Sequence, residues 1–282
     1  MTNKIPAPSR LEQRELERLV RSLAGSPDLE IDRVTEALSQ TLAIHPFSEQ
    51  MVKRGRTSGS YWSVGLVLAT LLEQGDSVLD FGCGAGGKPA LAQALGFNAT
   101  GVDDFGDSWH QDPTAMQQVR DFSTAAGHNL VELATQDIPE GPGEGYHLAM
   151  SNDVLEHQPN SPRSYLERLV EMLRPGGYLL STVPNIANLR KRVELLRGNT
   201  NLPPFDEYYN TDGAWRGHIR EYSRGDMERL SPLLGLEEVF LMGRDHMLQV
   251  LPTRVTEPYL AFTSVVRVKD SWLLVSRKPT NT

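Results

Sequence analysis

A glycine-rich turn directly after a short apolar segment constrains the fold of this chain most strongly. Residues 78–87 read Val-Leu-Asp-Phe-Gly-Cys-Gly-Ala-Gly-Gly, and residues 77–81 predict a buried strand that leads into the turn. Residues 88–95 then predict a helix, with Pro89 in the first turn, where a missing N–H costs little. A strand, a glycine turn and a helix in this order are typical of an α/β fold whose ligand approaches the backbone closely.

The alternation of strands and helices continues along the chain. Seven segments predict strands: 77–81, 99–102, 130–134, 146–150, 178–183, 236–242 and 271–277. Strands that alternate with helices pair in parallel through right-handed crossovers. We therefore predict a doubly wound seven-stranded sheet, with a ligand site beyond the carboxyl ends of its strands.

The segments on either side of this pattern differ from it. Residues 1–59 predict an N-terminal helical extension with two amphipathic helices and a polar, glycine-bearing stretch after 48. Residues 60–282 predict the sheet-forming domain, and residues 199–217 within it have no clear period.

Composition excludes several classes of protein. Apolar residues make up 39% of the chain and charged residues 23%, as in globular proteins, and no apolar run approaches the roughly 18 residues of a membrane helix. The first ten residues lack the apolar core of a signal peptide, so we expect a cytoplasmic protein without membrane insertion. The net charge of −8 repels polyanions, so we expect no nucleic-acid partner.

Cysteine and histidine spacing gives no sign of a metal centre. Cys83 is the one cysteine, which excludes an intrachain disulfide, and we interpret it as a small residue within the glycine turn. No histidine pair has i, i+4 spacing and no Cys/His cluster has zinc spacing, so we expect no metal.

The glycines alone leave the ligand open between two classes. Gly82, Gly84 and Gly87 fit the dinucleotide pattern G-x-G-x-x-G, whereas Gly86 in the third place gives G-x-G-x-G. Asp103, 21 residues after Gly82, suits ribose hydroxyls in either case. A carboxylate two residues before the first glycine is awkward beside a pyrophosphate but suits an ammonium or sulfonium group.

Five segments then appear in the order typical of one family. These are 78–87, 101–103, 136–138, 153–157 and 173–177. Over about residues 60–242 the chain resembles class I S-adenosylmethionine-dependent methyltransferases, and within them the branch that methylates small molecules, quinones and sugars. The segment 217–223 is similar to members associated with glycan and natural-product pathways. The resemblance implies a Rossmann-like methyltransferase sheet and S-adenosyl-L-methionine as cofactor.

The resemblance implies cofactor-binding roles for eight residues: Asp80, Gly82, Cys83, Gly84, Asp103, Asp137, Ile138 and Asn152. Asp80 would orient the methionine ammonium, and Asp103 would hold the ribose. Asp137 would bind the adenine amino group together with the backbone of Ile138. The structural alternatives are a helix N-cap for Asp80 and a strand-to-turn acid for Asp137.

On the acceptor side, two histidines are candidate catalytic bases, because the intrinsic pKa of histidine is near 6.5. His157 is the first candidate and His218 the second; either could instead be a structural or turn histidine. Four residues are candidates for substrate contact: Asp153, Tyr208, Trp215 and Arg220. Arg220 could instead form a surface pair with Glu221. We interpret 199–222 as an acceptor-side insertion.

The leading hypothesis is a transferase that moves a methyl group to a small-molecule or sugar acceptor. We expect oxygen as the acceptor atom, in-line displacement and a histidine base. The alternatives are an NAD-type oxidoreductase and a non-catalytic S-adenosylmethionine-binding module. Residues 1–59 would form either a lid or a homodimer contact.

Overall fold

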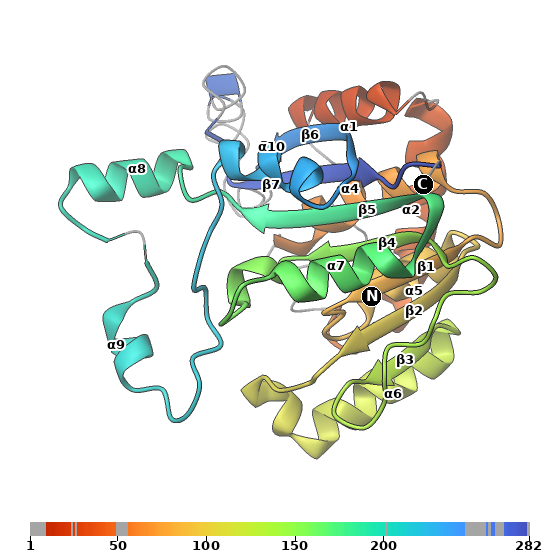
Figure 1. Ribbon diagram of the computed structural model, residues 1–282, viewed down its shortest axis with the longest axis horizontal. Coiled ribbons are helices and arrows are strands. Elements are labelled where there is room, and N and C mark those ends of the chain that lie inside the picture. Colours follow the sequence, from red (N-terminus) through yellow and green to blue (C-terminus); the bar gives the residue numbers. More distant parts are fainter. Residues whose placement is uncertain are drawn as a thin grey trace.

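One mixed sheet dominates the structure, a computed structural model that describes residues 10–23, 25, 27–48, 56–200, 202–245, 258, 261–262 and 268–280 (Figure 1). The strands are β1 (Ser77–Phe81), β2 (Asn98–Asp103), β3 (Asn129–Glu132), β4 (Tyr146–Asn152), β5 (Leu173–Pro184), β6 (Glu237–Arg244) and β7 (Ser271–Arg277). The helices are α1 (Arg10–Ser22), α2 (Pro27–Ile44), α4 (Arg56–Leu71), α5 (Gly87–Ala94), α6 (Pro113–Ala126), α7 (Arg163–Met172), α8 (Leu189–Leu196), α9 (Phe205–Tyr209) and α10 (Arg224–Leu233), with short 3₁₀ turns η1 (Ser108–Gln111) and η2 (Leu155–His157).

The strand order is β3-β2-β1-β4-β5-β7-β6, which confirms the predicted seven-stranded α/β sheet. The five strands β1 to β5 pair in parallel, so their carboxyl ends lie at one edge. The expectation of parallel pairing is wrong for β7, which lies between β5 and β6 and is antiparallel to both. Antiparallel neighbours need no helical crossover between them, so the alternation of elements does not fix the direction of this last strand.

Side chains that alternate along the strands pack into two separate cores, one on each face of the sheet. Val78 packs with residues of α1, α2, α4 and α5 on one face, whereas the next residue, Leu79, packs on the opposite face with Leu169 of α7. Figure 1 shows α7 and α10 in front of the sheet and the N-terminal helices behind it. Within the predicted extension 1–59 the structure describes α1, α2 and the start of α4, and Leu19 and Val20 of α1 are fully buried. Its role as a lid or dimer contact stays a prediction.

Capping contacts fix the start of two helices. Asp112 caps α6 through the backbone N–H of Thr114, and Ser223 forms a capping box with Asp226 at α10. The segment 173–177 forms the start of β5. Helix α7 ends at Met172 and β5 begins at the next residue, so this strand is longer than the predicted strand 178–183.

Residues 185–222 leave the sheet and form an arm at one side. Figure 1 shows α8 and α9 projecting from the rest of the molecule. The arm returns to the sheet at Tyr222, whose N–H donates to Pro184 O at 3.2 Å. Among the described helices, none has both the length and the apolar character to cross a membrane.

Candidate active site

The glycine turn after β1 folds back onto the end of β2. The N–H groups of Gly82 and Cys83 donate to the carbonyl oxygen of Val102, at 2.8 and 3.1 Å. Gly82 has a φ of 75°, and a Cβ there would lie 2.4 Å from a methyl carbon of Val154. Glycine alone avoids both problems, and the turn therefore presents bare backbone at the carboxyl edge of the sheet.

Asp103, the last residue of β2, holds the turn in place. One carboxylate oxygen accepts from the N–H of Gly84 at 2.8 Å, and the other accepts from the N–H of Phe105 at 2.8 Å. Each carboxylate oxygen has two acceptor sites, so Asp103 retains capacity for ligand hydroxyls. Its position and chemistry suit the predicted ribose contact.

Asp80 is a buried carboxylate with an unfilled acceptor. It is 1% exposed, and its Oδ1 accepts from Asn152 Nδ2 at 3.4 Å. Its Oδ2 has no hydrogen-bond partner among the described residues. Burial raises the pKa of Asp80 to about 6, against the opposing charge of Lys88. A buried acid with an orphaned oxygen is not acting as a helix cap; it suits a cationic group of a ligand.

A pocket of about 420 Å³ opens at the carboxyl ends of β1, β2 and β4. Six of the residues predicted from sequence line it: Gly82, Gly84, Asp103, Asp153, His157 and Trp215. Asn152 is 3% exposed, and its side chain donates to Asp80 and accepts from Thr182 Oγ1 at 3.3 Å. The site therefore lies at the edge that the sheet topology predicts.

Five of the eight predicted cofactor residues lie outside the lining of this pocket: Asp80, Cys83, Asp137, Ile138 and Asn152. Cys83 is half-buried, and burial raises the pKa of its thiol well above the ordinary value, which fits a packed small residue. Asp137 is exposed, whereas Ile138 packs against the core on the α7 side of the sheet. The adenine contact of Asp137 and Ile138 stays a prediction.

Asp153 follows β4 in a backbone conformation that is rare for a side-chain-bearing residue. Its φ is 57°, its N–H donates to Thr182 O at 2.9 Å, and its Oδ1 accepts from Thr182 Oγ1 at 3.1 Å. Left-handed backbone at a non-glycine residue is often found where function requires a particular side-chain direction. Asp153 is thereby held at the wall of the pocket.

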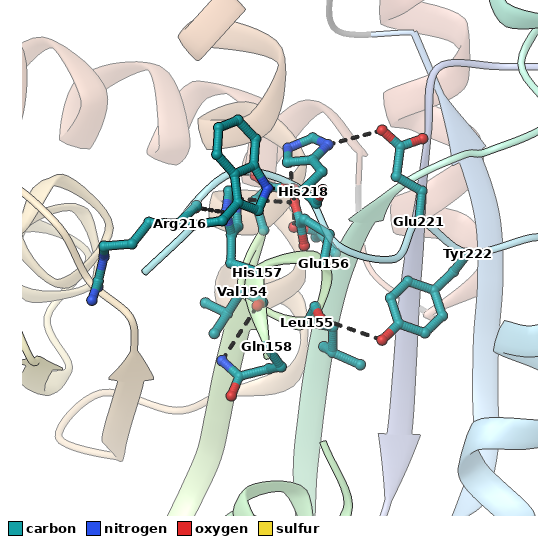
Figure 2. Close-up of polar contacts among 12 residues, drawn as sticks. Val154, Leu155, Glu156, His157, Gln158, Arg216, His218, Glu221 and Tyr222 are labelled. Carbon is teal, nitrogen blue, oxygen red and sulfur yellow. Dashed lines mark hydrogen bonds and ion pairs between the residues drawn. The ribbon is translucent and has the colours of Figure 1, made fainter. Parts of the chain in front are cut away.

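Both candidate histidines approach one buried acid, Glu156 (Figure 2). The Nε2 atoms of His157 and His218 each lie 3.9 Å from Glu156 Oε1, and their ring centroids are 4.8 Å apart. The carbonyl oxygen of Glu156 also accepts from Ile219 N at 2.7 Å, which ties the returning arm to η2. The fold thus brings together two predicted catalytic residues about 60 positions apart in sequence.

The other ring nitrogen of each histidine is fixed by an acceptor. His157 Nδ1 lies 2.6 Å from the carbonyl oxygen of Arg216, and His218 Nδ1 lies 2.8 Å from Glu221 Oε1. A carbonyl only accepts, so His157 carries its proton on Nδ1, and the carboxylate favours the same tautomer in His218. Both Nε2 atoms are then free to accept a proton or to bind a cation.

Burial sets the protonation states in this cluster. Burial, with the charges of His157 and Lys191, lowers the pKa of His218 to about 4, so this ring is neutral near pH 7. Burial and the nearby charge of Asp153 raise the pKa of Glu156 well above its ordinary value. Neutral imidazole is the form that can act as a base or a ligand.

Arg216 crosses from the arm to the loop after β2. It donates to Asp107 Oδ1 at 2.7 Å and to both carboxylate oxygens of Asp104, at 2.8 and 3.1 Å. Burial alone would raise the pKa of Asp104, but the hydrogen bonds from Arg216 and Gly106 outweigh it and lower the pKa. All three charged side chains line the pocket, so this contact closes one side of it.

Of the remaining candidates for substrate contact, one lines the pocket and two do not. Trp215 lines the pocket, and Tyr208 contacts its ring edge-on at a centroid distance of 5.4 Å. Arg220 faces away from the main pocket and pairs with Asp226 at 3.4 Å. The alternative Arg220–Glu221 pair is wrong, because Glu221 contacts His218 and forms an ion pair with Lys191.

Sequence reasoning missed Glu156 and the pairing of Arg216 with Asp104 and Asp107. Glu156 lies inside the quoted segment 153–157, and its place beside a histidine was the available signal. Arg216 had none, because its partners are more than 100 positions away.

Comparisons with known proteins agree with this geometry. Residues 60–239 match a family described as a methyltransferase domain. A ubiquinone biosynthesis O-methyltransferase from Shewanella pealeana is 31% identical over 124 residues, 44% of this chain and 50% of that protein. The protein of the same name from Pseudomonas savastanoi pv. phaseolicola is 31% identical over 112 residues, 39% of this chain and 45% of its own. The chain thus spans about half the length of these curated relatives.

Solved structures show the same fold. A candidate sarcosine dimethylglycine methyltransferase from Galdieria sulphuraria superposes with a TM-score of 0.51. The likeness covers 83% of this chain and 88% of that one, at 13% sequence identity. At this identity the likeness supports the fold and carries no further conclusion about substrate.

Proposed function

Because this chain belongs to the methyltransferase domain family, as a class I S-adenosylmethionine-dependent methyltransferase, we propose that it methylates an oxygen atom of a small-molecule or sugar acceptor. The observation that carries the proposal is the histidine pair at the pocket, whose Nδ1 atoms are engaged and whose Nε2 atoms are free. An acceptor hydroxyl must lose a proton as it is methylated, and an imidazole nitrogen at the pocket suits that need. The name of the curated relatives, O-methyltransferase, supports oxygen as the acceptor atom.

The residues of the pocket fit the cofactor. S-adenosylmethionine supplies a methyl group on a positively charged sulfur and also carries an ammonium group. The orphaned oxygen of Asp80 suits a cation, and the bare turn at Gly82 and Gly84 admits a ligand against the backbone. Asp103 retains acceptor capacity for ribose hydroxyls. In this proposal Asp80 orients the methionine end and Asp103 the ribose.

The family also separates the alternatives that sequence left open. Membership selects methyl transfer over hydride transfer, so an NAD-type oxidoreductase is not carried further. The enzyme's task is mainly to hold the acceptor oxygen in line with the methyl group and the sulfur. We propose that Asp153 and Trp215 position the acceptor, because both line the pocket beside His157.

His157 is the histidine that lines the pocket directly, so we propose that the acceptor proton passes toward its Nε2. His218 stands behind it, within 4.8 Å between ring centroids, and completes the cluster. The strained backbone of Asp153 precedes this cluster by three residues and sets the direction of η2.

The test is methyl transfer from radiolabelled S-adenosylmethionine to catechol as a phenolic probe and to methyl glucoside as a sugar probe. Formation of labelled methyl ether with S-adenosylhomocysteine supports the proposal. Labelled product from an amine probe such as glycine, with none from the hydroxyl probes, would overturn oxygen as the acceptor atom. Tight cofactor binding with no transfer to any probe would favour the non-catalytic module.

His157→Ala separates the base from the cofactor site. We expect turnover to fall about 100-fold, within the usual range for loss of a general base, with unchanged affinity for S-adenosylhomocysteine. His147→Ala is a matched control, because that histidine pairs with Asp76 at 3.0 Å away from the pocket.

A further inference from the structure

The cluster of Glu156, His157 and His218 has the donor set of a metal site. Each residue offers one ligand atom, and the three atoms lie within 4.8 Å of one another. Two imidazole nitrogens and one carboxylate are a ligand set of catalytic zinc sites, which keep a further position open.

The carboxylate is the second observation that points to a ligand. Glu156 is 1% exposed, and neither of its carboxylate oxygens has a hydrogen-bond partner among the described residues. A buried carboxylate without a partner is costly, whereas a bound cation would satisfy it. The Nε2 atoms of the two histidines each lie 3.9 Å from Glu156 Oε1, so both rings face this carboxylate.

The outer contacts are those that orient metal-binding histidines. Such histidines donate their other N–H to a backbone carbonyl or a carboxylate, which fixes the tautomer and the ring direction. His157 has the first kind of partner, Arg216 O, and His218 has the second, Glu221. Lys191 is occupied by its ion pair with Glu221, so its charge is directed to that acid.

The two distances from Glu156 Oε1 to the histidine nitrogens are close to those of a zinc site, and the three ligand atoms lie within 4.8 Å of one another. With bonds of about 2.0–2.1 Å in a tetrahedral site, neighbouring ligand atoms lie roughly 3.4 Å apart. The two nitrogen–oxygen distances of 3.9 Å exceed that by about half an ångström. Side-chain rotation can supply this, because His157 and His218 are partly exposed.

We propose that Glu156, His157 and His218 bind one divalent transition-metal ion of the zinc class at the acceptor end of the pocket. The expectation of no metal followed from local spacing, which cannot detect ligands that two distant segments contribute. His157 of this site lines the pocket. His218 comes from the arm, which the Ile219–Glu156 backbone hydrogen bond ties to η2.

The site refines the proposed function and rests on it. A divalent cation here would withdraw electron density from an acceptor hydroxyl and make its proton easier to lose. The proton leaves to water, an oxygen lone pair forms the bond to the methyl carbon, and the carbon–sulfur pair stays on sulfur. The sulfonium thereby becomes a neutral thioether. In this refinement the two histidines serve as ligands, the cation would lower the pKa of the acceptor hydroxyl, and water accepts its proton.

The direct test is metal binding by the whole chain, prepared without a histidine tag and dialysed against EDTA. Titration with Zn²⁺ alone, in competition with a chromophoric chelator, should show one tight site per chain. Co²⁺ in place of Zn²⁺ should give visible absorption bands typical of a low-coordinate nitrogen and oxygen site. Neither readout depends on methyl transfer.

The variants locate the site. Glu156→Gln and His218→Ala should each weaken Zn²⁺ binding by on the order of 100-fold or more, and Glu221→Gln, an outer partner, by about 10- to 100-fold. His147→Ala, which removes a histidine–carboxylate pair elsewhere, should leave binding unchanged. Glu156 is buried, so its substitution can affect folding. His218 is more exposed, and His218→Ala therefore serves as the second variant. Thermal unfolding of both variants distinguishes loss of the metal site from loss of the fold.

The outcomes separate the two proposals. Absence of stoichiometric binding, or binding that survives in both His218→Ala and Glu156→Gln, would overturn the metal site. Methyl transfer to catechol that is insensitive to EDTA, with no Zn²⁺ bound, would do the same while leaving the proposed function intact. One bound Zn²⁺ with no transfer to any hydroxyl probe would support the site and overturn the proposed function.

Discussion

The two sides of the pocket are built in different ways. On the side that we propose binds the cofactor, Asp80, the glycine turn and Asp103 lie within 24 consecutive residues and contact one another through the backbone of adjacent strands. On the acceptor side, Glu156 and His157 meet His218 and Arg216 from an arm that first leaves the sheet. The residues of the first side are brought together by nearness in sequence and by strand pairing. The residues of the second side meet only where the arm 185–222 packs back against the sheet.

The difference is also one of exposure. Asp80 is 1% exposed, whereas Leu196 and Tyr209 on the arm are 88% and 73% exposed. A rigid, buried cofactor side suits a ligand common to a family, and an exposed arm suits an acceptor that differs between members. Five changes test this contrast, from the side where a substitution should matter most to the side where it should matter least.

The largest effect is expected from Gly82→Ala. The substitution places a Cβ 2.4 Å from Val154 and forces a side chain into a φ of 75°. Left-handed backbone costs about 1–2 kcal/mol, and displacement of the turn by about 1 Å can lower turnover roughly 100-fold. Thermal unfolding and the rate of methyl transfer measure the two effects, and calorimetric titration with S-adenosylhomocysteine should show weaker cofactor binding.

Gly75→Ala is the matched control for that change. Gly75 has a φ of 86°, but a Cβ there would meet nothing within 4 Å. It should share the backbone cost and keep normal cofactor affinity. Equal loss of affinity in both variants would refute a specific role for the turn at Gly82.

Asp80→Asn should separate stability from binding. Folding raises the pKa of this acid from 3.8 to about 6, so at pH 7 its ionised form destabilises the fold by on the order of 3 kcal/mol, and the amide should raise the melting temperature. Loss of a charged contact to the ammonium should weaken cofactor binding by about 10- to 100-fold. A variant that is more stable and binds equally well would remove Asp80 from the cofactor site.

The pH dependence of cofactor binding follows from the same acid. Below its pKa of about 6 Asp80 takes up a proton and loses the charge that attracts a cation. Affinity for S-adenosylmethionine should therefore fall about tenfold between pH 7 and pH 5, because one ionised carboxylate in ten remains. Lys88, Asp103 and Asp153 also act on Asp80, so Asp80→Asn is the reference, and its profile should be flat.

Arg216→Ala tests the contact that joins the two sides. The side chain is 46% exposed and pairs with Asp104 and Asp107. Exposed pairs contribute less than about 1 kcal/mol each, so stability should change little. Dissociation of S-adenosylhomocysteine should become about threefold faster by stopped-flow fluorescence. Arg163→Ala, in an exposed pair with Glu167, is the control, and an equal change there would dismiss a closing role.

The smallest effect is expected on the arm, from Tyr208→Ala. Its ring contacts Trp215, and such aromatic pairs contribute about 0.5–1.5 kcal/mol. The KM for the acceptor should rise a few-fold, with unchanged cofactor affinity. The neighbouring Tyr209 contacts Phe205 instead, so Tyr209→Ala should leave both constants unchanged. A larger change at Tyr209 would place the acceptor on the other face of α9.

Much of the cofactor side was predictable because its signals are local. The apolar run before Gly82, the glycine spacing and the acid after the second strand lie close together in sequence. The capping residues Asp112 and Ser223 were readable for the same reason. The direction of β7 was not, because an antiparallel strand with the same apolar pattern fits the same place.

The sequence by itself determined the α/β class, the site at the strand ends and the family, because backbone conformation and burial there depend on neighbouring residues. Only the tertiary structure decided that His157 and His218 share Glu156, and that Arg216 reaches Asp104 and Asp107. Those contacts join segments about 60 and 110 residues apart. Their formation depends on how the arm packs back against the sheet, which no local pattern encodes.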